Sequence, residues 1–449
     1  MKRLALSALL FMLFFASLSA GRVAAEKQGG TETYEKLAFL PLSQWKDTLL
    51  RPIPPTINFC NLTVAFEEKG DSLTLTFGGT TQTFKPSPEP AFFSFSKDGK
   101  QYVMGVFHTP EGWKYFNAML AKMKEGKRVV YGFDLNCDGV YFVPGVDGLI
   151  YPGSHCVVPC PEWPIWMGDS LAKIYPAQGG GYEMKLEKMK FPRAELKALA
   201  LINDFRVKAG LHPYLLDEGL SKACRLHAAY VAANGADQID TPYEERPGAE
   251  GYTQEGARIA PSSLYYYFGD IPTAIHVMLG HIFYRTYFVK ANINRMGIGF
   301  ADPISVYNAT KSADKVYDYR YPILIPGPEQ TIPYQSYYKS TATVNPDPRP
   351  GAAGCGFPVT LTWDWGERPE LVEAKFYFVT RKKEIPEQIS ASGPNKPATA
   401  FYTDNRNIIA VIPLNPLKPK SRYHVVIKYK VNGREAVADW YFNTGKKED

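Results

Sequence analysis

The strongest constraint on the fold lies in residues 196–235, where apolar side chains recur every three or four residues on both sides of a short break. The recurring positions are Leu199, Ile202 and Phe205 before the break, and Leu215, Leu220, Ala223, Leu226, Ala229 and Tyr230 after it. Such spacing gives a helix one apolar face. Gly210 and Pro213 interrupt the pattern and Asn234-Gly235 closes it, as expected for a turn and a helix end. Two amphipathic helices are therefore predicted at the centre of the chain.

A series of polar and turn residues accompanies these helices in a fixed order. Its members are Asn203, Arg206, Gly210, Leu211, Pro213, Asp217 and His227. Residues 251–257 (GYTQEGA) and 296–300 (MGIGF) follow, with a predicted helix over residues 273–290 between them. Together they resemble the CAP superfamily, the domain shared by cysteine-rich secretory, antigen 5 and pathogenesis-related 1-like proteins and by bacterial secreted SCP-like proteins. The resemblance implies a central CAP α/β/α sandwich at residues 186–302.

The whole chain is predicted to be a multidomain α+β protein. Short Val-, Phe- and Tyr-rich runs between Gly, Pro and Asp turns predict a mostly β N-terminal domain at residues 31–182, with one helix near residues 112–124. Gly179-Gly180-Gly181 is interpreted as the linker into the central domain. Beyond a second linker at residues 303–320, β-rich runs at residues 321–444 resemble a C-terminal bacterial Ig-like β-sandwich.

Residues 1–25 have the pattern of a signal peptide, with Lys2 and Arg3, an apolar run over residues 4–18, and a small-x-small cleavage site at residues 23–25. We therefore expect a secreted or extracytoplasmic protein. No later run approaches the roughly 20 apolar residues of a membrane span. The formal net charge of +6 comes from 51 basic and 45 acidic residues without a long block of one sign, which argues against nucleic-acid binding. A mildly basic surface weakly favours contact with an anionic cell envelope.

Six cysteines in an exported chain suggest disulfide bonds. Cys60 with Cys137, and Cys156 with Cys160, are the favoured pairs, and other pairings remain open. A metal site that includes His155, Cys156 and Cys160 is the alternative, although a zinc ion usually needs four ligands and no second pair of suitable residues stands nearby.

A second motif, in the N-terminal region, has the opening of a calcium-binding loop. Asp134, Asn136 and Asp138 stand at positions one, three and five, and a glycine follows at position six. The twelfth position, which supplies a bidentate glutamate in an EF-hand, is Gly145. An ordinary hairpin turn explains the same residues, so calcium binding and a structural turn both remain open.

The CAP resemblance implies a central cavity in which two histidines and one or two glutamates can bind a divalent cation. The GYT-x-EGA match assigns the glutamate to Glu255, but the position of one histidine holds Tyr284. No histidine stands between Ala228 and His276, where the other is expected. The candidate cavity residues are Gln238, Asp240, Glu255, His281, Tyr284 and Arg285. This set suits hydrogen bonding to a polar ligand better than binding of a metal.

Catalytic motifs are not found: the chain has no Gly-x-Ser-x-Gly, His-Glu-x-x-His or activated-cysteine pattern. Cys224 is expected to be a buried thiol, and His227 to orient its neighbours or pack among them rather than act as a ligand. Aromatic residues at 265–268 and 283–288 favour core packing over a surface for sugar or peptide recognition. The favoured function is a non-catalytic exported protein that binds a glycan, peptide or lipid. A metal-assisted hydrolase of envelope polymer or peptide, and a purely structural or adhesive surface protein, remain alternatives.

Overall fold

The computed structural model describes residues 21–22, 51–59, 62–77, 80–86, 91–97, 100–109, 112–136, 138–154, 157–176, 182–235, 242–267, 270–310, 321–332, 337–338, 354–364, 366–395 and 407–446. The predicted signal peptide lies outside these residues except for β1 (Gly21–Arg22), which pairs with β15 (Tyr182–Lys188). Within the described residues, no helix combines the length and the apolar character that crossing a membrane requires.

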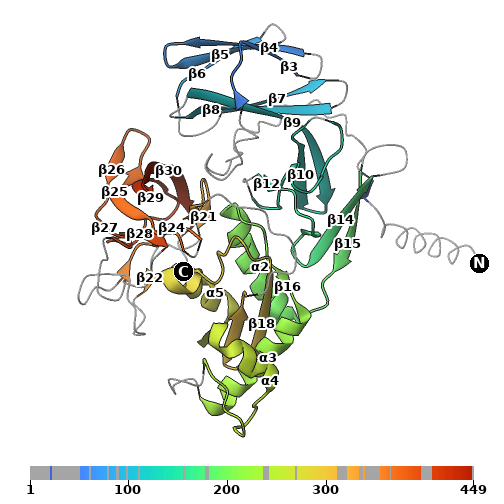
Figure 1. The fold of residues 1–449 in the computed structure, drawn as a ribbon, viewed down its shortest axis with the longest axis vertical. Helices are drawn as coiled ribbons and strands as arrows, with labels where there is room; N and C mark the ends of the chain where they lie inside the picture. The colour runs from blue at the N-terminus through green and yellow to red at the C-terminus, as the bar shows by residue number, and fades with distance from the viewer. Residues whose placement is uncertain are drawn as a thin grey trace, which may run out of the picture.

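The first part of the chain contains two β-sheets packed face to face, at the top of Figure 1. One sheet has the order β3-β4-β5-β6, with strands Thr56–Phe59, Leu62–Lys69, Ser72–Phe77 and Thr80–Phe84. It packs on the part of a longer sheet formed by β7 (Ala91–Lys97), β8 (Lys100–Thr109) and β9 (Gly112–Glu125). Alternate residues such as Val64 and Phe66 meet Met104 and Trp113 in the shared core. Each sheet therefore buries one face, as the alternating sequence pattern predicts.

The helix predicted near residues 112–124 is wrong, because this segment is the strand β9, which pairs with β8 on one side and with β10 (Arg128–Asp134) on the other. Four apolar residues recur there at helical intervals, which imitates a helix. They are Phe116, Met119, Leu120 and Met123. In the structure, Trp113 and Tyr115 enter the first core, while Ala118 and Met123 enter a second one. Pairing along both edges outweighs the local helix preference of residues such as Ala, Met and Lys.

The second core of the N-terminal part lies against the centre of the chain. The long sheet continues through β10 to β11 (Gly148–Ile150) and β12 (Val158–Pro159), and a smaller sheet contains β13 (Ile165–Trp166), β14 (Ser170–Pro176) and β15. Since β14 and β15 pair along their whole length, Gly179-Gly180-Gly181 joins two strands of a hairpin and is not the linker into the next part. The N-terminal part accordingly ends near Lys188, not at residue 182. Its core includes Val207 of the following helix, and the Ser154 hydroxyl donates to the carbonyl oxygen of Val207 at 2.6 Å.

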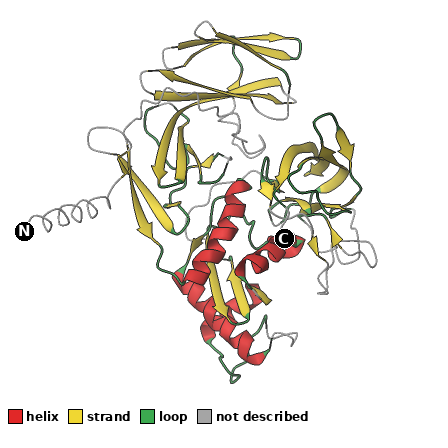
Figure 2. Cartoon of the chain, turned by 180° about the vertical axis from the view of Figure 1, so that it is seen from behind, coloured by secondary structure: helices red, strands yellow, loops and turns green. Residues whose placement is uncertain are grey.

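The centre of the chain is a three-layer unit with helices on both faces of a sheet, as Figure 2 shows in red and yellow. The sheet has the order β16-β18-β19-β17, with strands Leu215–Leu216, Arg295–Ala301, Ile304–Asn308 and Leu264–Tyr267. Helices α2 (Arg193–Lys208) and α5 (Ile271–Gly280) cover one face, and α3 (Glu218–Asn234) and α4 (Gln254–Ile259) cover the other. Along β18, Met296 and Ile298 face the first pair of helices, while Gly297 and Gly299 face α3. This is the α/β/α layering expected for this stretch.

Two boundaries of the central unit differ from the sequence prediction. The helix expected over residues 273–290 is two helices, α5 and α6 (Ile282–Arg285), separated by His281, which has extended backbone angles. The linker expected from residue 303 begins later, because β19 is a full member of the central sheet and pairs with both β17 and β18. The central unit therefore continues at least to Asn308.

The last part of the chain is a sandwich of two β-sheets. One has the order β20-β24-β28-β27, with strands Ile323–Ile325, Val359–Thr362, Ile408–Pro413 and Ile389–Ser392. The other has the order β21-β30-β29-β25-β26, with strands Thr331–Ile332, Arg434–Thr444, Arg422–Val431, Glu370–Val379 and Glu384–Pro386. A separate pair is formed by β22 (Tyr337–Tyr338) and β23 (Gly354–Cys355). Phe376, Tyr423 and Phe442 pack ring against ring in the core. The predicted strands are present as β24, β25, β28, β29 and β30.

The core of the sandwich is continuous with the core of the central unit. One cluster of buried apolar residues runs from Leu199 of α2 to Phe442 of β30. Gln330 donates to the carbonyl oxygen of Phe205 at 3.3 Å, and a Cβ placed on Gly327 would lie 2.7 Å from the Cα of Ala209. Backbone therefore meets backbone at the end of α2, and the central unit is packed against β structure on both sides (Figure 1).

Candidate functional site

Helix α3 carries His227 into the interior of the central unit. Asp217 caps the helix, since its carboxylate accepts the backbone N–H of Leu220 at 2.8 Å. A Cβ on Gly299 of β18 would overlap the backbone of Cys224 and Arg225, so only glycine lets the helix lie directly on the strand. Farther along α3, the His227 side chain is 0% exposed.

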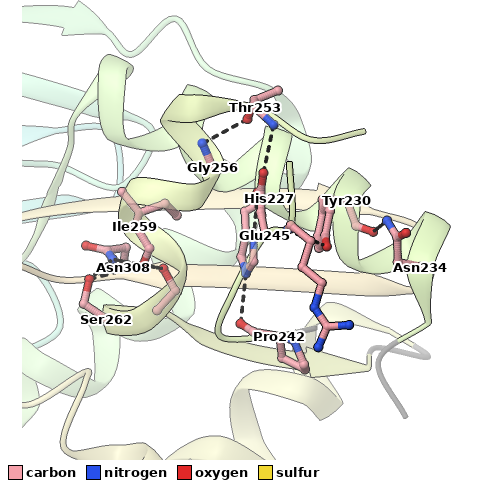
Figure 3. A network of polar contacts seen from close by, with 12 residues as sticks. His227, Tyr230, Asn234, Pro242, Glu245, Thr253, Gly256, Ile259, Ser262 and Asn308 are labelled. Carbon is pink, nitrogen blue, oxygen red and sulfur yellow. Dashed lines mark hydrogen bonds and ion pairs between the residues drawn. The ribbon is translucent and has the colours of Figure 1, made fainter. Parts of the chain in front are cut away.

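Figure 3 shows the polar network that holds His227. Its Nδ1 lies 2.9 Å from Oε1 of Glu245, and its Nε2 lies 2.9 Å from the carbonyl oxygen of Pro242. The second carboxylate oxygen of Glu245 accepts the backbone N–H of Thr253 at 2.9 Å. The Thr253 hydroxyl in turn accepts the N–H of Gly256 at 3.0 Å and caps α4. The network therefore ties α3, the loop at residues 242–253 and α4 to one another.

The neighbours of His227 decide where its protons are. The Pro242 carbonyl can only accept, so Nε2 carries a proton. The contact between Nδ1 and Glu245 requires another proton, on the ring or on the carboxyl group. Both ring nitrogens are thus engaged, and neither offers a lone pair to a metal ion. The residue orients its neighbours, as its place in the helix suggested.

Replacing Glu245 by alanine should weaken this region strongly. The His227 ring and the backbone N–H of Thr253 would lose their acceptor inside the protein, and each buried group left unsatisfied costs about 1–3 kcal/mol. We expect urea denaturation to show a loss of roughly 2–4 kcal/mol in the free energy of unfolding.

Two further variants make that test specific. Glu245→Gln keeps an acceptor for Thr253, and its amide can donate to a neutral His227 ring. Its free energy of unfolding should therefore fall by about 1 kcal/mol or less. Glu244→Ala, at an exposed position, should behave as wild type. Equal losses in the Glu244 and Glu245 alanine variants would refute the anchoring role of the carboxylate.

Glu255, the glutamate that the CAP resemblance assigns to the cavity, lies on the exposed side of α4. Its Oε1 is 3.3 Å from Nζ of Lys222, and both side chains are at least half exposed. Its own backbone N–H and the Lys222 ammonium hold the pKa of Glu255 below its usual value. The buried carboxylate of this stretch is instead Glu245. Gln238 and Asp240 lie outside the described residues.

Tyr284, at a position where the resemblance places a histidine, belongs to a tyrosine group made of Tyr243, Tyr266, Tyr284 and Tyr287. Burial raises the pKa of Tyr284, and the nearby Tyr243 and Tyr266 raise it further. Burial and Tyr243 likewise raise the pKa of Tyr287, and burial raises that of Tyr266. Tyr243 is 50% exposed and meets Tyr265 edge-on at 5.6 Å. The group therefore presents phenol hydroxyls and ring faces that are partly open to solvent.

The two other candidate cavity residues on this segment do not share one environment. His281 is buried and stacks on Tyr284, with ring centroids 4.2 Å apart. Arg285 is buried but turned toward the C-terminal sandwich, which corrects its assignment to the cavity. Its contacts are the carbonyl oxygens of Leu279 (2.6 Å) and Pro358 (2.8 Å), the hydroxyl of Thr360 (3.2 Å) and the ring of Phe357 (4.5 Å). The end of α5 at His281 lets the short α6 direct Arg285 across the interface.

In the loop at residues 134–140, the candidate calcium loop, side-chain oxygens accept hydrogen bonds from the backbone of the loop itself. Asp134 accepts the N–H groups of Gly139 (2.8 Å) and Asp138 (3.3 Å). The Asn136 amide donates to one carboxylate oxygen of Asp138, and the other accepts the backbone N–H of Val140. These are bonds that a structural turn makes. Among the described residues, no group of three or more His, Cys, Asp or Glu side chains is placed to hold a metal ion.

A neighbouring carboxylate, Asp147, holds the other side of this loop. It is buried and accepts the backbone N–H groups of Leu135 (3.3 Å) and Val143 (2.8 Å). Burial, with a smaller contribution from Asp134 and Asp138, raises the pKa of Asp147 to about 6.

Cys160 and Cys224 are free thiols in this structure. Cys160 is buried and forms no disulfide, so the expected bond to Cys156 is not formed in this structure. Cys60, Cys137 and Cys156, with His155, lie outside the described residues. Cys224 is fully buried and burial raises the pKa of its thiol, which agrees with the expectation of an inert buried thiol.

Sequence reasoning missed two residues of this region, Tyr243 and Glu245. A signal for Glu245 was present, because a histidine on the buried face of a helix needs acceptors for its ring nitrogens. The run PYEE at residues 242–245 follows α3 closely and holds two carboxylates. No comparable signal singled out Tyr243, since its proximity to Tyr284 is set by the path of the loop.

Comparisons with known proteins concern the same central unit. Residues 199–302 match the CAP family, described as the cysteine-rich secretory protein family. Among solved structures, an extracellular protein containing an SCP domain from Bacillus anthracis str. Ames is 9% identical, over 66% of this chain and 100% of that one, with a TM-score of 0.23. A cysteine-rich secretory protein from Staphylococcus aureus subsp. aureus Mu50 is 12% identical, over 58% and 86% of the two chains, with a TM-score of 0.20. No curated protein matches the sequence.

The family match begins within α2 and ends just after β18. It therefore spans the two helices whose apolar spacing stands out in the sequence, the His227 network and the glycine-bearing strand on which α3 lies. The chain thus contains, at residues 199–302, a CAP domain of the cysteine-rich secretory protein family.

Proposed function

We propose that this protein is an exported, non-catalytic binding protein whose CAP domain takes a hydroxyl-rich ligand of the oligosaccharide class at the tyrosine group. The observation that carries this proposal is the gathering of Tyr243, Tyr266, Tyr284 and Tyr287 from a loop, a strand and the segment around α6. Burial raises the pKa of Tyr266, Tyr284 and Tyr287 further above its usual value, so these three phenols stay protonated near pH 7. Phenol hydroxyls then donate and accept hydrogen bonds, and ring faces pack on the apolar faces of a sugar.

The state of the neighbouring polar residues supports binding over metal-assisted hydrolysis. His227 uses both ring nitrogens within the protein, and Glu255 is engaged by Lys222 at the surface. Tyr284 replaces a nitrogen donor with a phenol whose pKa is raised, and a protonated phenol is a poor metal ligand. A hydrolase would need a group that activates water, and these residues offer none in that state.

The parts on either side of the CAP domain are proposed to act as supports. The C-terminal sandwich, for which an Ig-like architecture is the proposal, shares a core with the CAP domain, and the N-terminal part packs on α2 from the other side. Export rests on the signal-peptide pattern of residues 1–25. In this arrangement the CAP domain is held rigidly, which favours a preformed binding surface.

An oligosaccharide array, followed by calorimetry with the best-bound oligosaccharide, tests the proposal. Tyr284→Phe removes one neutral hydrogen bond, so its affinity should fall about three- to tenfold. Tyr243→Ala removes an exposed ring, so its affinity for the oligosaccharide should fall at least as far as that of Tyr284→Phe. Tyr175→Ala, at an exposed tyrosine of β14, should bind as wild type does.

The outcomes separate the alternatives. Wild-type protein that binds no saccharide, or tyrosine variants that bind as wild type does, would remove the proposal. Selective binding to peptides or to lipid vesicles in parallel assays would show that the ligand is a peptide or a lipid, not an oligosaccharide. Release of shortened oligosaccharides during the assay would favour the hydrolase.

A further inference from the structure

On the outer face of the five-stranded sheet of the C-terminal sandwich, one imidazole is held between two carboxylates. His424 of β29 places Nδ1 3.0 Å from Oε2 of Glu384 on β26, and Nε2 2.7 Å from Oδ1 of Asp439 on β30. The His424 side chain is 11% exposed, and the two carboxylates are 35% and 36% exposed. This group has no part in the CAP domain or in the tyrosine group.

Two tyrosines fix the orientation of the ring. Tyr377 of β25 and Tyr441 of β30 are the cross-strand partners of His424 on its two sides. Their ring centroids lie 5.6 Å and 4.3 Å from the imidazole, with interplanar angles of 27° and 11°. The Tyr441 hydroxyl also donates to Glu384 Oε1 at 3.1 Å. Stacked on both faces, the imidazole cannot turn away from one carboxylate without leaving the stack.

Because an ionised carboxylate can only accept, contact with two of them requires a doubly protonated ring. A neutral imidazole has one N–H, so it can donate to one carboxylate only, and its second nitrogen then turns a lone pair toward the other. Burial by itself lowers the pKa of His424, but hydrogen bonds to Asp439 and Glu384 outweigh it and raise the pKa above the usual value.

The charged and titratable groups around the ring come from every neighbouring strand. They are Tyr377 on β25, Glu384 on β26, Arg422 on β29, and Asp439 and Tyr441 on β30. The cation among them, Arg422, lies 4.6 Å from the Tyr441 ring and pairs with Glu329 at 2.6 Å. Because its charge is balanced there, the two carboxylates remain as the partners of an imidazolium.

The two carboxylates are not held equally firmly. Asp439 lies in β30, which pairs with β29 from Arg422↔Asn443 to Val431↔Arg434. Glu384 belongs to β26, a three-residue strand at the end of the sheet order that pairs with β25 alone among the described strands. When the ring loses a proton, the shorter bond to Asp439 is the one expected to persist. The lone pair on Nδ1 then repels Glu384 and, with it, the edge strand.

We propose that His424 is a proton-operated latch, in which the doubly protonated ring holds β26 against β29 and β30, and loss of one proton releases β26 and uncovers the edge of β25. The uncovered edge would carry unpaired backbone N–H and C=O groups, which can pair with an added strand. Because the pKa is raised on folding, the stabilising contribution is complete below the unfolded value of about 6.5 and is lost as the pH rises through the folded value.

Hydrogen exchange of the full chain, measured by mass spectrometry at pH 5.5 and pH 8.5 and corrected for intrinsic exchange rates, tests the latch. In wild type, protection of the peptide that contains β26 should fall about tenfold or more at the higher pH. His424→Gln, which carries no charge, should show weak protection at both pH values. His108→Gln, at an exposed histidine of the N-terminal part, should behave as wild type does.

A second variant keeps the test decisive if His424→Gln does not fold. In Glu384→Gln the amide can donate to the lone pair of a neutral ring, so β26 should stay protected at both pH values. Corrected protection of β26 in wild type that is the same at both pH values would overturn the latch. So would a Glu384→Gln protein that loses protection at high pH to the same extent as wild type.

Discussion

Replacing Gly299 by alanine should lower the free energy of unfolding by more than about 3 kcal/mol or prevent the CAP domain from folding. The added Cβ would overlap the backbone atoms of Cys224 and Arg225 in α3. A flexible side chain could turn aside, but backbone can yield only if the whole helix shifts. That shift would also disturb His227, which the same helix carries. Urea denaturation of the purified protein measures the loss.

A glycine within α3 itself provides the matched control. A Cβ on Gly219 would meet only Oδ1 of Asp217, at an ordinary contact distance of 3.5 Å. Alanine is favoured over glycine in a helix, so Gly219→Ala should be neutral or up to about 1 kcal/mol more stable. If Gly299→Ala kept wild-type stability, α3 could not lie directly on β18.

Arg285→Met should uncouple the CAP domain from the C-terminal sandwich. The guanidinium donates to the carbonyl oxygens of Leu279 and Pro358 and to the hydroxyl of Thr360, inside the shared core. Methionine keeps much of the volume but removes the guanidinium donor from these three acceptors. Each buried unsatisfied group costs about 1–3 kcal/mol, so the free energy of unfolding should fall by roughly 3–5 kcal/mol.

Differential scanning calorimetry gives the clearest readout for Arg285. Wild type should unfold the two parts in one joint transition, and Arg285→Met should split it, with the CAP transition at lower temperature. Arg285→Lys keeps the charge without the planar fork of donors, so its effect should be intermediate. Arg258→Met, at an exposed position of α4, should leave the scan unchanged. A joint transition in Arg285→Met at the wild-type temperature would show that the arginine does not couple the two parts.

The proposed binding surface and this interface meet on one short helix. Tyr284 belongs to the tyrosine group, while the next residue, Arg285, enters the interface with the sandwich. A substitution at either residue can therefore displace the other side chain through the backbone of α6. For this reason, binding measurements on tyrosine variants should be accompanied by calorimetric scans.

Features fixed by neighbours along the chain were predictable. The apolar spacing that predicts α2 and α3 is local, and the strands β5, β6, β25, β29 and β30 follow from alternation and turn residues. The turn after α2 is local as well, because the Asn203 amide bonds both backbone groups of Tyr214, eleven residues later. Interactions of this range leave a pattern in the sequence.

The sequence-based predictions that were wrong share a different cause. β9 carries a helical spacing of apolar residues, yet strands on both sides make it extended. The triple glycine resembles a linker, yet β14 and β15 pair across it. In both cases the deciding contacts come from other strands, whose positions a local pattern does not contain.

The candidate site divides in the same way. By itself, the sequence determined the CAP domain, the loss of a histidine at Tyr284, and the burial of Cys224, because each follows from a motif or from one helix face. Only the tertiary structure decided that Glu245, not Glu255, is the buried carboxylate, that Arg285 joins the sandwich, and that His424 lies between two carboxylates. The physical reason is distance along the chain: Arg285 and Thr360 are separated by 75 residues and His424 and Glu384 by 40. Which polar groups meet over such separations depends on how whole elements pack, and it is this packing that assigns each charged side chain its partner.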